Sequence, residues 1–344
     1  MLFLALALAS QLSVGAATEP TTTQLAATAT YEFELLAAPN PGQSMGNGLD
    51  SRTGLVVGGV RDLPGSFVPT LWRDGVSVNL PIPGGATEAW AFRANQSGMV
   101  LCGAQSPTGE IAFVHVGGQN QVLPPLFGVR AWAADLNDAG IVVGGSSDAF
   151  AAHPHAAVAW LPSGVVLPLG SPATWTSIAR GINASNVIVG EMRPTPSDPP
   201  QPFVWSHGVL APLALPSSLA HGAAQDVNDR GTIVGQAFNA PATQVPIVWV
   251  SGAPFVLPLP PTASKGYAVR VNERGQILGA ATLAASGELK PFLWSAGQFT
   301  FVEHLVASPA GWTYVGAFDL DDGGRIVGWG NLNGQVRGFV LTPL

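Results

Sequence analysis

The chain has 344 residues, of which 10% are charged, 42 are Gly and 30 are Pro. So few charges and so many helix-breaking residues exclude a coiled coil or a helix bundle, while 47% hydrophobic residues exclude a disordered chain. The 14 Lys and Arg against 21 Asp and Glu give a net charge of −7, so we expect no nucleic-acid partner.

The first segment, residues 1–17, is typical of a secretory signal peptide. An apolar run from Leu2 to Ala9 is too short to cross a membrane, and the small residues up to Ala17 suit signal peptidase. A buried apolar strand is the alternative. Residues 18–30 are rich in Thr and Ala, which predicts a flexible tether. We expect a secreted or periplasmic protein that is not an integral membrane protein after cleavage.

One pattern recurs through the rest of the chain, residues 31–344. It is Ala-x-x-φ-Asn-x-x-Gly-x-φ-φ-Gly, where φ is apolar, and its clearest copies span 133–144, 224–235 and 268–279. Its last position falls at 58, 102, 144, 190, 235, 279 and 328, in steps of 44, 42, 46, 45, 44 and 49. A four-residue apolar segment keeps the same period and ends at Trp72, His115, Trp160, Trp205, Trp249, Trp294 and Leu341. Such a period indicates a repeat architecture.

Each copy contains four short β-strand signals separated by turns. Four antiparallel strands per 40–50 residues predict a blade, and seven copies predict an all-β, seven-bladed β-propeller of four-stranded blades. The last copy ends before its fourth strand, and residues 31–37 supply one, so the N-terminal strand is expected to close the last blade. A linear solenoid is the alternative.

The repeated residues are interpreted as structural anchors. The motif asparagines are expected to cap the turn after the first strand, and the last glycine of the motif is expected to lie in the second strand. The tryptophans are expected to pack between blades. These anchors are Asn137, Asn183, Asn228, Asn272, Gly144, Gly190, Gly235, Gly279, Gly328, Trp72, Trp160, Trp205, Trp249 and Trp294.

The pattern resembles the HAF family of extracellular repeats, in which Gly-Ile-Asn-x-x-Gly-x-Val-Val-Gly precedes His-Ala-Phe-Leu-Trp. Residues 181–190 and 136–144 are similar to the first half. The resemblance implies a secreted bacterial propeller-like protein and no particular reaction or ligand. Where the family has His, this chain has Val68, Ile111, Ala156, Gln201, Val245, Lys290 and Arg337.

No motif points to a cofactor, a metal or a catalytic group. The Asp-rich turns at 135–138, 226–229 and 319–322 lack the ligand spacing of a calcium loop and are interpreted as turn caps. His153 and His155 lack a third ligand nearby, so a solvated loop is favoured over a metal site. Cys102, the only cysteine, replaces a motif glycine and is expected to be buried and unreactive.

A second set of aromatic residues lies at or before the first strand of five copies: Trp90, Trp132, Trp175, Tyr267 and Trp312. In a propeller this places them on one face near the central channel, where they could bind an extracellular polysaccharide or a protein. Packing between blades is the alternative. We expect a monomeric, non-catalytic binding propeller. The competitors are a hydrolase or lyase using carboxylates such as Glu88, Asp226 and Glu273, and a purely structural surface or matrix protein.

Overall fold

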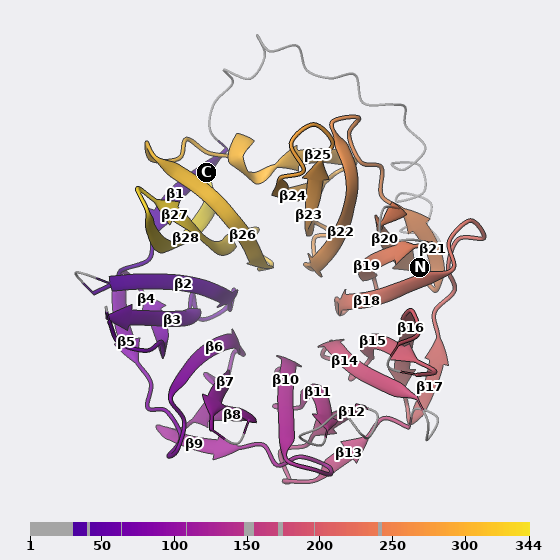
Figure 1. Ribbon diagram of the computed structural model, residues 1–344, viewed down its shortest axis with the longest axis horizontal. Coiled ribbons are helices and arrows are strands. Elements are labelled where there is room, and N and C mark those ends of the chain that lie inside the picture. Colours follow the sequence, from indigo (N-terminus) through magenta and orange to yellow (C-terminus); the bar gives the residue numbers. More distant parts are fainter. Residues whose placement is uncertain are drawn as a thin grey trace.

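The computed structural model describes residues 30–39, 42–62, 64–107, 109–147, 155–170, 175–195, 197–239 and 243–344. Within these ranges the strands form seven antiparallel sheets of four, which are arranged as blades in a ring (Figure 1). The protein is a seven-bladed β-propeller, which confirms the fold inferred from the repeat. The expected signal peptide and residues 18–29 of the expected tether lie outside the described residues.

Six blades are built from four consecutive strands that run from the centre of the ring outward (Figure 1). Blade 1 contains β2 (Gly42–Leu49), β3 (Val56–Asp62), β4 (Val68–Arg73) and β5 (Val76–Asn79), and blade 2 contains β6 (Glu88–Ala94), β7 (Val100–Ser106), β8 (Gly109–Val116) and β9 (Gln119–Val122). Blade 3 contains β10 (Arg130–Leu136), β11 (Val142–Ser147), β12 (Ala156–Trp160) and β13 (Val166–Pro168), and blade 4 contains β14 (Thr176–Ile182), β15 (Ile188–Arg193), β16 (Gln201–Ser206) and β17 (Val209–Pro212). Blade 5 contains β18 (His221–Val227), β19 (Ile233–Phe238), β20 (Val245–Val250) and β21 (Ala253–Val256), and blade 6 contains β22 (Ala263–Val271), β23 (Ile277–Leu283), β24 (Leu289–Ser295) and β25 (Gln298–Phe301), which the short 3₁₀ helix η2 (Val302–His304) follows.

The seventh blade joins the two ends of the described chain. It contains β26 (Trp312–Leu320), β27 (Ile326–Leu332), β28 (Gln335–Pro343) and, on its outer side, β1 (Tyr31–Leu35). β1 pairs antiparallel with β28 from Tyr31 opposite Pro343 to Leu35 opposite Phe339. The N-terminal strand therefore closes the ring as expected, and it covers what would be an open edge of β28.

Every inner strand contains a β-bulge between the motif Ala and the apolar residue before the motif Asn. In blade 3, Ala133 lies opposite Gly144 and Asp135 lies opposite Val143, so Ala134 is the extra residue. The backbone approaches closely here, because a Cβ at Gly144 would collide with the carbonyl of Trp132. The same collision explains the glycine at the last motif position of five other blades, which is Gly58, Gly190, Gly235, Gly279 or Gly328, whereas blade 2 has Cys102 there.

The motif asparagines connect successive blades at the turn end of the inner strands. The side-chain oxygen of Asn183 accepts hydrogen bonds from the N–H groups of Ser185 and Val187 in its own turn, while its amide nitrogen donates to the carbonyl of Asn228 in the next blade at 3.0 Å. The asparagines thus cap turns and join blades at once. Equivalent inter-blade donations run from Asn95 to Asn137, Asn137 to Asn183, Asn228 to Asn272 and Asn272 to Asp321.

The tryptophans that end the third strands lie between blades. Trp72, Trp160, Trp249 and Trp294 are at most 3% exposed, and Trp205 is half-buried. Trp72 packs with Val327 and Val340 of the preceding blade in the ring. Three of the indole N–H groups donate to a carbonyl in the connection from the preceding blade: Trp72 to Ala37, Trp160 to Pro124 and Trp249 to Ala214. At these three positions burial of the indole also satisfies its polar atom, whereas Nε1 of Trp294 is buried without a hydrogen-bond partner among the described residues.

Candidate binding pocket in the central channel

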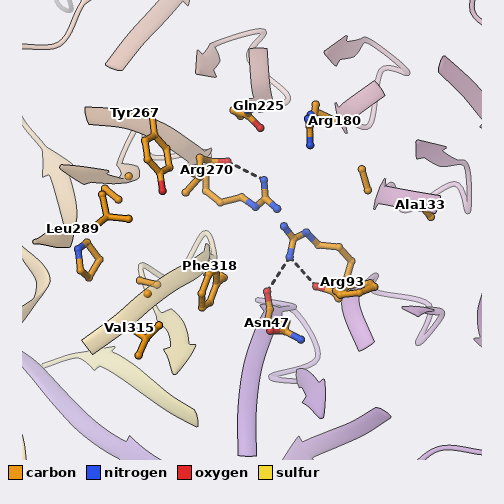
Figure 2. A pocket seen from close by; sticks show the side chains of 18 of the residues that line it. Asn47, Arg93, Ala133, Arg180, Gln225, Tyr267, Arg270, Leu289, Val315 and Phe318 are labelled. Atoms are coloured by element: carbon orange, nitrogen blue, oxygen red, sulfur yellow. Dashed lines mark hydrogen bonds between the residues drawn. The ribbon is translucent and has the colours of Figure 1, made fainter. Parts of the chain in front are cut away.

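A pocket of about 510 Å³ lies in the central channel (Figure 2). All seven inner strands line it, and it extends between blades 6 and 7, where Gly279 and Ala280 of β23 and Leu289 and Pro291 of β24 also contribute. This volume falls in the range of about 300–1,000 Å³ that is usual for small-ligand sites. The lining residues from the inner strands are Asn47, Phe92, Arg93, Trp132, Ala133, Ala134, Arg180, Gln225, Tyr267, Val269, Arg270, Val315, Gly316, Ala317 and Phe318.

The β-bulges place a different side chain from each blade in this lining. The extra residue of each bulge lies in the first variable position of the repeat motif, and a bulge turns that residue out of the regular alternation of the strand. The seven bulge residues are Asn47, Phe92, Ala134, Arg180, Gln225, Val269 and Phe318. The seven blades therefore share nearly the same backbone, but the side chains that they present to the pocket differ in size, polarity and charge around the ring.

Two arginines from opposite sides of the ring point toward the channel axis (Figure 2). Nη1 of Arg93 donates to the carbonyls of Asn47 at 2.9 Å and Phe92 at 2.7 Å. Nη1 of Arg270 donates to the carbonyl of Val269 at 2.8 Å, and its Nε donates to Asp319 at 3.2 Å. These bonds hold both guanidinium groups in fixed orientations, which reduces the entropy lost when they bind a ligand.

Three aspartates occupy the second variable position of the motif and join neighbouring blades. Asp135 accepts a hydrogen bond from the N–H of Ile182, and Asp226 accepts one from that of Val271. Asp319 accepts one from Leu49 at 2.8 Å. The carboxylates also lie beside the arginines, at 3.6 Å for Arg93 with Asp135, 3.8 Å for Arg93 with Asp319 and 3.2 Å for Arg270 with Asp319. None of the three lines the pocket.

Burial of these carboxylates shifts their titration. Burial, and then the nearby charge of Asp135, raises the pKa of Asp226 to about 8. Burial raises the pKa of Asp135 to about 6, although Arg93 acts in the opposite direction. Burial likewise raises the pKa of Asp319, again opposed by Arg93. Near neutral pH the cluster therefore contains a protonated Asp226, since three adjacent buried anions would repel one another.

The structure brings two of the five expected aromatic residues into the pocket. Trp132 and Tyr267 line it. Trp90 packs beside Phe67, with 6.0 Å between ring centroids. Trp175 lies against the hydrophobic cluster between blades 3 and 4, and Trp312 lies within blade 7, packed on Phe33, Tyr314 and Phe339. The pocket also contains Phe92 and Phe318, whose positions in the motif differ from those of the expected set.

The carboxylates considered for catalysis are not gathered in one place. Glu88 begins β6 opposite Gln105, whereas Glu273 lies in the turn after β22 and accepts a hydrogen bond from the N–H of Asp229. These two positions are at opposite ends of the inner strands, and neither lines the pocket. Asp226 does not line the pocket either, and its carboxylate accepts a hydrogen bond from the N–H of Val271 in the next blade.

The residues considered for metal binding are placed as follows. Among the described residues, no three His, Cys, Asp or Glu side chains are grouped to hold a metal ion. In the Asp-rich turns, Asp138 accepts a hydrogen bond from the N–H of Gln96 in the preceding blade. His155 packs edge-on against Trp132 at 4.9 Å between ring centroids, and His153 lies outside the described residues. Cys102 is 1% exposed, and burial raises the pKa of its thiol.

The sequence pattern did not identify Arg93, Arg180 and Arg270 as pocket residues. A signal was present, because they lie in the two variable positions of an otherwise regular inner strand. In a strand without a bulge these adjacent positions would face opposite sides. The bulge places the first variable position of each blade in the channel, and the long side chains of Arg93 and Arg270 reach it from the second position. This bulge is a feature of the strand pairing and has no sequence signature of its own in the motif.

Comparisons with known proteins support the fold. No protein-family model matches the chain, and no curated protein matches it. Among solved structures, the chain is similar to the β-propeller domain of the Trilobed protease from Pyrococcus furiosus, with 10% identity over 87% of this chain and 93% of that one and a TM-score of 0.57. It is also similar to YCF48 bound to D1 peptide, with 14% identity over 94% and 99% of the two chains and a TM-score of 0.56. A prolyl endopeptidase structure has 10% identity over 99% of this chain and 54% of that one, with a TM-score of 0.58. At these identities the similarity shows the propeller fold alone.

The described residues contain no helix of sufficient length and apolar character to span a bilayer.

Proposed function

We propose that this protein is a secreted, non-catalytic binding propeller that holds its ligand in the central pocket. The observation that carries the proposal is the composition of the lining. Aromatic and aliphatic side chains and three arginines contact the cavity, whereas no Asp, Glu, His, Cys, Ser or Lys of the described chain lines it. Acid–base and nucleophilic catalysis require a suitable group within reach of the reacting bond, but binding does not. The remaining candidate in the lining is the phenol of Tyr267, and burial raises its pKa above the usual value, so it stays protonated near neutral pH and is a poor base or nucleophile there.

The expected ligand is an extracellular peptide or carbohydrate. Aromatic rings such as Trp132 and Tyr267 offer flat apolar surface to either class, and the arginines offer hydrogen-bond donors. YCF48, whose propeller is similar in fold, is bound to D1 peptide. Export is supported by the signal-like residues 1–17.

Two other functions make different predictions. A hydrolase or lyase would need carboxylates facing the cavity, and the aspartates nearest to it are instead bonded to backbone N–H groups of the next blade. A structural surface protein would have no small ligand and would self-associate. The binding proposal expects a monomer, which light scattering after gel filtration would check.

Tryptophan fluorescence of the purified protein provides the test, with peptides and oligosaccharides as titrants and product formation assayed in the same samples. We expect a saturable change without product. Trp132→Ala should weaken binding at least about fivefold, since an aromatic contact contributes about 1 kcal/mol or more with its buried area. Trp90→Ala is the matched control, because Trp90 precedes the motif Ala as Trp132 does and lies outside the pocket. Product formation, or self-association without any ligand, would contradict the proposal.

A further inference from the structure

We propose that the pocket recognises the free C-terminus of a peptide whose last residue is apolar. This inference rests on the proposed binding function and names its ligand class. The α-carboxylate would contact Arg93 and Arg270, and the last side chain would occupy the apolar niche between blades 6 and 7, formed by Ala280, Leu289, Pro291, Val315 and Phe318.

The two arginines provide the anion-binding part of the site. Each uses Nη1, and in Arg270 also Nε, in the hydrogen bonds that orient it. The Nη2 atoms of Arg93 and Arg270 make no hydrogen bond to any described residue, while both side chains line the cavity. Guanidinium groups with a fixed plane and a remaining N–H donor match the geometry of a carboxylate.

The charge of the lining selects against a cation. Arg93, Arg180 and Arg270 are its only ionised side chains among the described residues. Arg180 is 38% exposed on its side chain and pairs with Glu191 at 3.3 Å, outside the lining. Asp135 and Asp319 lie beside Arg93 and Arg270 and partly balance their positive charge. A protonated Asp226 leaves the cluster without a third negative charge, which favours an anion in the pocket.

The niche provides the apolar part of the site. Leu289 and Val315 are 41% and 46% exposed, although both lie inside a concave pocket with Phe318. The small residues Ala280 and Gly316 also line the pocket here, and the absence of a Cβ at Gly316 leaves room for the ring of Phe318. Apolar side chains that remain uncovered in a cavity gain about 25 cal/mol for each Å² that a ligand removes from water.

The balance of polar and apolar side chains favours a peptide over an acidic sugar. A sugar carries several hydroxyl groups, each of which needs a hydrogen-bond partner when buried. The lining offers few uncharged polar side chains, and one of them, Asn47, already donates to the carbonyl of Ala91. A peptide end with one carboxylate and an apolar side chain makes fewer polar demands.

The test compares acetyl-Gly-Ala-Leu with its C-terminal amide by titration calorimetry on the full protein. We expect the free acid to bind at least about tenfold more tightly than the amide, since a charge-assisted hydrogen-bond pair is lost in the amide. Arg270→Gln should weaken binding of the acid and leave any amide binding unchanged. Arg180→Gln removes a positive charge from the lining without removing a contact to the carboxylate, so it should weaken binding of the acid by a smaller factor. Because Arg270→Gln leaves Asp319 without its 3.2 Å partner and could impair folding, Arg180→Gln and the comparison of acid with amide test the proposal independently.

A niche variant and a distant control complete the design. Val315→Asp places a negative charge beside the apolar side chain of the ligand and should abolish binding of the acid. Arg230→Gln should have no effect, because Arg230 is exposed and pairs with Glu273 in the turns, away from the pocket.

Three results would overturn the inference. They are equal affinity for acid and amide, tighter binding of a galacturonic acid trimer than of the peptide, and no binding of either peptide. If the galacturonic acid trimer binds more tightly and its signal is lost in Trp132→Ala, the pocket still binds a ligand, but that ligand is a carbohydrate and the peptide inference is wrong. If no member of the wider panel binds, the proposed function fails as well.

Discussion

Replacing Asp226 with Asn should change how stability depends on pH. Asp226 is half-buried beside the channel, where Oδ2 accepts the N–H of Val271 at 2.9 Å. An Asn side chain has nearly the same shape, and its Oδ1 can accept the same hydrogen bond. The substitution therefore removes the ability to ionise while retaining the contact between blades 5 and 6.

The expected size follows from the titration of the native side chain. Burial and the charge of Asp135 raise the pKa of Asp226 from 3.8 to about 8, so the folded protein retains a proton that the unfolded chain releases. The stabilising contribution of this group is complete below about pH 4 and is lost as the pH rises to about 8. At ~1.4 kcal/mol per pH unit the full interval corresponds to about 6 kcal/mol, an upper limit because Asp226 is only half-buried and water can reach the ionised side chain.

Urea unfolding followed by tryptophan fluorescence at pH 5, 7 and 9 would measure the effect. We expect Asp226→Asn to be more stable than the native protein by about 2–5 kcal/mol at pH 9, with a smaller difference at pH 5. Asp229→Asn is the matched control, since Asp229 is an exposed carboxylate three residues further along. A difference between Asp226→Asn and the native protein that stays constant from pH 5 to pH 9 would refute the reasoning.

Two further predictions concern other parts of the ring. Asn183→Ala should lower the free energy of unfolding by about 2–3 kcal/mol, because it removes the caps on Ser185 and Val187 and the donation to Asn228; a loss below about 0.5 kcal/mol in urea unfolding would contradict this. The thiol of Cys102 should react with Ellman's reagent only after unfolding, since it is 1% exposed and burial raises its pKa; rapid labelling of the native protein would show that the site opens.

The repeat predicted the fold closely because propeller blades are formed by contacts that are local in the chain. The motif around Asn137 and the segment ending at Trp160 recur at nearly constant spacing, and each recurrence is one meander of hairpins. Ring closure was predictable for a similar reason, because the last copy lacks a fourth strand and residues 31–35 provide it. The count of seven blades follows directly from the count of copies.

The candidate site was predicted only in part. The position of Trp132 and Tyr267 before the motif Ala indicated the channel, and both line the pocket. Trp175 and Trp312 occur farther before the motif Ala and pack elsewhere, and Trp90 shares the position of Trp132 yet packs on Phe67. Which side an aromatic ring takes depends on the space left by neighbouring blades, and that space is not encoded in its own segment.

The sequence by itself determined the four-stranded form of the blade, the number of blades and the strand that closes the ring. Each of these depends on the alternation of apolar and polar residues, on turn residues and on their spacing along one stretch of chain. The tertiary structure decided the chemistry of the centre. Arg93 and Arg270 are 177 positions apart in the sequence, yet they meet at the axis because the ring places blades 2 and 6 across the same channel. Their direction depends on the β-bulges, and the high pKa of Asp226 depends on burial with Asp135 and Asp319 from two other blades.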